Sequence, residues 1–115
     1  MIREKRERGV LILSVLGSFM NERSTDRFEA AYKPHLAEKR FIVELAELDY
    51  IDSSHLAALV VLYKRVAQDG GLVVFSGLKQ TVRDTLFVTR LDKVFSIATS
   101  RKEALEMIEK ASTPG

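Results

Sequence analysis

Hydrophobic residues gather in short runs along the chain, and their spacing predicts alternating strands and helices. The runs at residues 10–16, 41–48 and 72–75 are apolar almost throughout or apolar-rich, which is typical of buried strands. A weaker first strand is expected at residues 2–6, and a short edge strand at residues 94–97.

Between these runs, apolar residues recur at intervals of three and four, as in helices that bury one face. Such segments follow residues 24–26, begin again near residue 53, occupy residues 79–89 and return after residue 100. The expected inward-facing positions are Phe28, Ala31, Tyr32, Leu36, Leu56, Leu59, Val60, Tyr63, Val66, Ala67, Val82, Leu86 and Phe87. Pro34 predicts a kink in the first helix, and Gly70 predicts the end of the second.

The order of elements, β-β-α-β-α-β-α-β-α, predicts a single α/β domain. Its sheet is expected to be mixed and mostly parallel, with four to five strands and about four helices. A length of 115 residues suits one such domain. We expect the domain to span residues 1–111 and residues 112–115 to form a flexible tail.

Composition narrows the possible functions. The chain has no cysteine, which excludes disulfides, a thiolate nucleophile and a cysteine zinc site and agrees with a cytoplasmic location. Its net charge is +2, and the basic residues near the N-terminus alternate with Glu4 and Glu7, so no one-signed stripe predicts direct nucleic-acid binding. No apolar run is long enough to predict a membrane span. No cofactor is expected.

The most informative segment is residues 52–56, where an expected strand leads into an expected helix. Asp52, Ser53 and Ser54 stand there, followed by His55 and Leu56. A helix N-terminus carries unpaired N–H groups and partial positive charge, so it accepts a capping oxygen or a phosphate group. From the residues alone, Ser53 is therefore either a helix cap or a phosphorylation site.

Other chemistry finds little support in the residues. His35 and His55 are the only histidines and lie in different expected elements, without metal-ligand spacing. Gly70, Gly71 and Gly77 are not followed by the Lys and Ser or Thr of a phosphate-binding loop, and no nucleophile-elbow motif occurs. We expect no metal site and no catalytic residues, and hence no enzyme.

The chain resembles the anti-sigma factor antagonists of the STAS domain family. The resemblance is carried by residues 50–54 and 56–59, by Gly70 and Gly71, and by residues 89–95. It covers nearly the whole chain and is strongest between residues 48 and 97.

The resemblance implies a non-enzymatic protein-binding module regulated by phosphorylation. By position, the phosphorylated residue is Ser53, and Asp52, Ser54, His55 and Leu56 belong to the partner-binding surface. The implied partners are a serine kinase of the histidine-kinase-like ATPase type, which is also the anti-sigma factor, and a PP2C-type phosphatase. The unmodified antagonist binds the kinase, and the phosphorylated form releases it.

The sequence departs from the family pattern at two places. His55 stands where the family often has glycine, and we expect its side chain to lie where a partner approaches. Met20 falls near a position that is acidic in many phosphorylated members.

Two alternatives remain open. The same fold serves as a non-switching scaffold or accessory subunit, in a signalling assembly or a lipid-transport ATPase. A response-regulator receiver has a similar length and alternation, but the acidic pair expected after its first strand is missing at residues 16–18.

Overall fold

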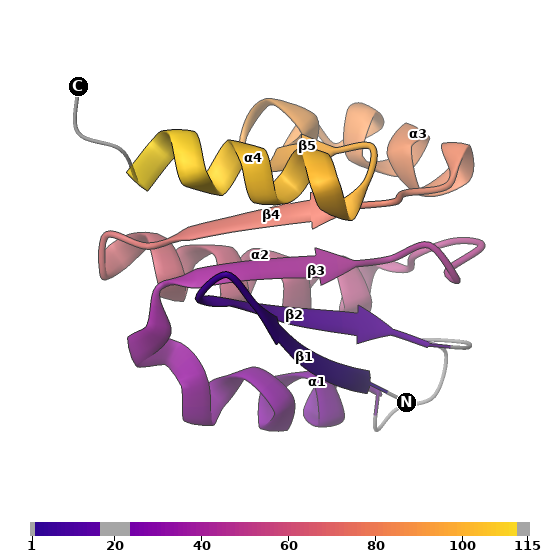
Figure 1. The fold of residues 1–115 in the computed structure, drawn as a ribbon. Helices are drawn as coiled ribbons and strands as arrows, with labels where there is room; N and C mark the ends of the chain where they lie inside the picture. The colour runs from indigo at the N-terminus through magenta and orange to yellow at the C-terminus, as the bar shows by residue number, and fades with distance from the viewer. Residues whose placement is uncertain (1, 17–23, 113–115) are drawn as a thin grey trace.

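A five-stranded sheet forms the middle layer of the protein (Figure 1). The computed structural model describes residues 2–16 and 24–112. The strands are β1 (Ile2–Glu7), β2 (Val10–Val15), β3 (Arg40–Glu44), β4 (Leu72–Ser76) and β5 (Ser96–Ala98). They lie in the sheet in chain order; β1 is antiparallel to β2, and the other neighbours are parallel. The predicted mixed, mostly parallel sheet is confirmed.

Helices cover both faces of this sheet. They are α1 (Ser24–Tyr32), α2 (Ser53–Gln68), α3 (Gln80–Val88) and α4 (Arg101–Ser112), with short 3-10 helices η1 (Lys33–Glu38) and η2 (Leu91–Lys93). Figure 1 shows α4 in front of the sheet and α2 behind it. The expected number of helices therefore holds for the described residues. The expected tail lies outside them, apart from Ser112 at the end of α4.

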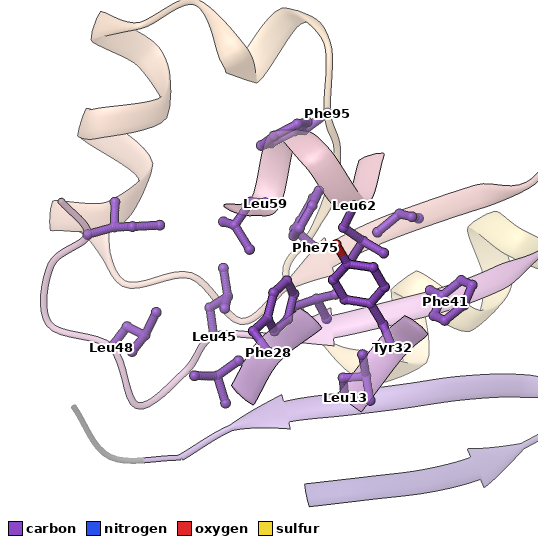
Figure 2. Packing of buried hydrophobic residues seen from close by; sticks show 14 of the residues in the cluster. Leu13, Phe28, Tyr32, Phe41, Leu45, Leu48, Leu59, Leu62, Phe75 and Phe95 are labelled. Atoms are coloured by element: carbon purple, nitrogen blue, oxygen red, sulfur yellow. The ribbon is translucent and has the colours of Figure 1, made fainter. Parts of the chain in front are cut away.

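The side chains of the central strands alternate between two cores, as the pleat of a strand requires. Leu11 and Leu13 of β2 join the larger core, together with residues of α1, α2 and α3. Val10 and Ile12 of the same strand join the smaller core beneath α4. Figure 2 shows the larger core, in which Phe28 and Tyr32 of α1 meet edge to face with ring centroids 5.3 Å apart.

The predicted kink at Pro34 is a change of helix type. The α-helix α1 ends at Tyr32, and Pro34 falls in the first turn of η1. Proline is tolerated there because its missing N–H would have no helical acceptor.

The third strand is shorter than predicted. It ends at Glu44, because the chain turns back at Leu48, whose N–H donates to the carbonyl of Leu45 at 3.0 Å. Leu45, Leu48 and Ile51 are nonetheless buried in the larger core. Leu45 and Leu48 belong to the segment predicted as strand, and in the structure all three residues anchor a loop.

Near the C-terminus, two expectations are corrected. Phe87 was expected to face inward, but it is 68% exposed, while Val82 and Leu86 bury the other side of α3. The fifth strand begins at Ser96, two residues later than predicted. Phe95 precedes it and is buried with its ring 4.5 Å from that of Phe75 (Figure 2).

Candidate functional site

The loop between β3 and α2 presents the candidate site at the carboxyl end of β3, an edge where parallel sheets commonly bind ligands. Three buried side chains, Leu45, Leu48 and Ile51, fix the loop from below. Asp49 fixes it to α3: its carboxylate accepts from Lys79 Nζ at 2.6 Å, and its backbone carbonyl accepts from the Thr81 hydroxyl. The loop is therefore held by its own core residues and by the neighbouring helix.

Asp52, and not Ser53, caps helix α2. The Asp52 backbone is extended, and its carboxylate Oδ1 accepts the backbone N–H of His55 at 2.9 Å. An aspartate in this position satisfies an N–H that the helix leaves unpaired and places negative charge at the positive end of the helix dipole. The capping role that the sequence left open for Ser53 belongs to Asp52.

Ser53 and Ser54 are the first two helical residues, and both are exposed. Within the described residues, neither hydroxyl takes part in a hydrogen bond, and both side chains are accessible to solvent. The Ser53 oxygen is therefore accessible to an enzyme and is not required for capping.

The His55 side chain is on the face of α2 that points toward the core. This is contrary to the expectation that it lies where a partner approaches. The residue is 3% exposed, and its Nδ1 lies 2.9 Å from Asp52 Oδ1. Burial lowers the pKa of His55 below its usual value, and the nearby Asp52 carboxylate opposes this shift. Burial therefore favours the neutral form of His55, whose Nδ1 lies beside the capping carboxylate.

Leu56 occupies an intermediate position. It is partly buried and packs against the larger core, which leaves only part of the side chain accessible. The exposed side of α2 instead carries Ser53, Ser54, Ala57 and Val61. These four residues, which we call the α2 face, span about a quarter of the helix circumference.

The α2 face borders a groove between α1 and α2. The groove has a volume of about 220 Å³ and is lined by Thr25, Asp26, Phe28, Glu29, Tyr32, Ser54, Ala57, Ala58 and Val61. Val61 is 40% exposed and adds apolar surface beside the groove. The sequence did not single out Ala57 or Val61, although they lie four and eight residues after Ser53, a spacing that places all three on one side of a helix.

The remaining candidate chemistry has a structural explanation. His35 contacts the carboxylates of Glu38, in η1, and Glu4, in β1. These contacts link η1 to β1. Within residues 2–16 and 24–112, no group of three or more His, Asp or Glu side chains is arranged so that it could hold a metal ion. No helix in that part of the chain is long and apolar enough to cross a bilayer. Residues 17–22, including Met20, lie outside the described residues.

Comparison with known proteins identifies the family. The model of the STAS domain family matches residues 2–104. The chain belongs to the STAS domain family. A curated relative, the "Putative anti-sigma factor antagonist BtrV" of Bordetella bronchiseptica, is 27% identical over 103 residues, which cover 88% of this chain and 89% of that protein.

Solved structures of other STAS proteins share the fold. An anti-sigma factor antagonist from Mycobacterium paratuberculosis superposes with a TM-score of 0.82 at 20% identity, covering 95% of this chain and 93% of that one. The phosphorylated form of the Bacillus cell fate determinant SpoIIAA gives a TM-score of 0.73 at 13% identity, covering 94% and 99%. The fold of this STAS protein therefore agrees with the resemblance found in the sequence.

Proposed function

We propose that this STAS protein is an anti-sigma factor antagonist that works as a phosphorylation-controlled binding module in the cytoplasm. In its unmodified state it binds a serine kinase of the histidine-kinase-like ATPase type, which is also the anti-sigma factor. Phosphorylation of Ser53 releases that partner, and a PP2C-type phosphatase restores the binding form. The module itself performs no catalysis.

One observation carries this proposal: the Ser53 hydroxyl is exposed at the start of α2 while Asp52 caps the helix. A kinase can reach that hydroxyl without disturbing the core. The name of the curated relative, an anti-sigma factor antagonist, supports the same class of function.

The α2 face gives the proposed switch its physical basis. Ala57 and Val61 offer apolar surface for a partner, and Ser53 lies at the end of that surface. A phosphate group adds about −1.5 to −2 charges at neutral pH. Placed against a docked partner, that charge must lose its hydration, and we expect a loss of affinity of about 100-fold or more.

Binding of the partner by three variants tests the proposal. We expect Ser53→Ala to bind the kinase that co-purifies from the native cells, Ser53→Asp to lose it, and the control Ser54→Asp to lose less affinity. The intact mass of the native protein should show one phosphate mapped to Ser53. If Ser53→Asp binds as well as the unmodified chain, the protein is a non-switching scaffold. Phosphate on Asp49 or Asp52 would instead indicate a receiver.

A further inference from the structure

A single carboxylate oxygen at the start of α2 is shared by two donors of the same residue. Asp52 Oδ1 accepts the backbone N–H of His55 at 2.9 Å and lies 2.9 Å from His55 Nδ1. The His55 side chain is 4% exposed, whereas that of Asp52 is 46% exposed. The carboxylate is therefore held from the buried side of the helix.

The His55 amide is also a donor that an anion at this helix end would use. It is the third N–H of α2, and the third N–H is a usual partner of a capping oxygen or a bound phosphate. The next amide, that of Leu56, already donates to the Asp52 carbonyl at 2.9 Å. With Asp52 in place, both of these amides are occupied.

We infer that His55 is a positioning residue of the switch: it holds the Asp52 carboxylate on the helix N-terminus, so that a phosphate group on Ser53 is kept off the His55 amide. This inference rests on the proposed function, because it concerns the phosphorylated form of Ser53. A phosphate bound to the helix amides would be partly neutralised by its own chain. A phosphate that is kept off the His55 amide presents more of its charge to the partner.

The proposed role of His55 requires a nitrogen that contacts Asp52, and not only a side chain that fills the buried space. Leucine would fill much of the same buried volume but has no donor for Asp52. Asparagine is smaller, yet its amide nitrogen stands in for Nδ1 and can donate to the same oxygen. His55→Leu and His55→Asn therefore separate packing from the hydrogen bond.

The inference is tested on full-length protein that carries phosphoserine at position 53, incorporated during translation, with 15N labelling. The amide proton of residue 55 and the 31P signal are followed by NMR through the second ionisation of the phosphate, which ordinarily lies near pH 6. In the otherwise unchanged protein, we expect the amide proton of residue 55 to keep its chemical shift through that titration. His55→Asn should behave in the same way.

In His55→Leu, the Asp52 carboxylate keeps only its bond to the backbone N–H of residue 55, and we expect the phosphate to compete with it for that N–H. The amide proton of residue 55 should then move downfield with the phosphate ionisation. The phosphoserine pKa should fall by about half a unit relative to the protein that retains His55. The inference is wrong if the residue 55 amide already follows the phosphate with His55 present, or if the Leu and Asn variants give the same titration.

The signals of β4 residues Val73, Val74 and Phe75 report whether each variant is folded. If His55→Leu does not fold, the titration of the protein that retains His55 can still contradict the inference, because a residue 55 amide that follows the phosphate there would overturn it. The phosphate is installed without a kinase, so the result is independent of whether cells modify Ser53. Failure of the proposed function would appear in partner binding and leave this titration unchanged.

Discussion

Glu44 and Arg101 join the end of β3 to the start of α4 through a two-pronged ion pair. Arg101 Nε donates to Glu44 Oε2 at 2.6 Å, and a terminal guanidinium nitrogen donates to Oε1 at 2.8 Å. The Ser14 hydroxyl adds a third bond to Glu44 at 2.7 Å from the adjacent strand β2. This cluster of three residues fixes the helix that covers the smaller core.

Removing the arginine should destabilise the domain. Arg101→Ala leaves the partly buried Glu44 carboxylate without its main partner, and we expect a loss of about 1–3 kcal/mol in the free energy of unfolding. Urea denaturation followed by circular dichroism measures this loss. The exposed neighbour Lys102 is the matched control, and Lys102→Ala should change stability by no more than about 0.5 kcal/mol. Equal effects of the two substitutions would contradict a special role for the pair.

The same cluster predicts how stability depends on pH. Hydrogen bonds from Arg101 hold the pKa of Glu44 below its usual value. The unfolded state then binds a proton at a higher pH than the folded state does, so this contribution is present above the usual glutamate pKa and is lost as pH falls through the lowered value. We expect the urea midpoint to decrease between about pH 5 and about pH 3, and to decrease less steeply in Glu44→Gln. Parallel curves for the two proteins would rule out Glu44 as the source.

The cap of α2 predicts unequal effects for two adjacent residues. Asp52→Ala removes the acceptor of the His55 amide, and we expect it to cost about 1 kcal/mol or somewhat more. Ser53→Ala removes an exposed hydroxyl without a described partner and should stay within about 0.5 kcal/mol of the unchanged protein. Thermal and urea unfolding of both variants give the comparison. A larger loss for Ser53→Ala would show that the serine takes part in capping.

Gly71 is required by a close approach between two segments of the chain. A Cβ atom at this position would lie 2.5 Å from the Lys39 carbonyl oxygen and 2.6 Å from Val66 Cγ1. Gly71→Ala must push β4 away from these atoms, and we expect a loss of about 1–3 kcal/mol. Gly70, with φ at +76°, has no atom within 4 Å of such a Cβ. Since asparagine tolerates this backbone, Gly70→Asn should cost less than Gly71→Ala in the same unfolding assay.

Much of the fold was predictable because its elements follow local rules. The strand at Val10–Val15 is nearly continuous in apolar residues because helices cover both faces of the sheet. The start of α4 also follows a local rule: the Glu103 amide donates to the Ser100 hydroxyl at 3.2 Å, a capping contact between residues three apart in the sequence. Such features depend on a few neighbouring residues and can be recognised without the tertiary structure.

The predictions were wrong where tertiary contacts determine the path of the chain or the burial of a side chain. The inward positions at Leu45 and Leu48 look like a continued strand, yet the chain turns there to bring the loop onto the core. His55 was expected at the surface because it stands where the family often has glycine and where a partner approaches. Its position says otherwise, since His55, Leu59, Leu62 and Val66 recur at intervals of four, three and four and form one buried stripe. This spacing indicates that His55 is buried, although histidine is a polar residue.

The attachment of Asp49 to Lys79 and Thr81 has a kinetic consequence for recognition. A binding loop that is ordered before encounter needs no rearrangement when it meets another protein, so collision in the right orientation limits the association rate. Modification at Ser53 would then act mainly by shortening the lifetime of the complex. Under the proposed function, the β3–α2 loop therefore holds the start of α2 in place, and we expect a phosphate on Ser53 to act on the lifetime of the complex and not on its rate of formation.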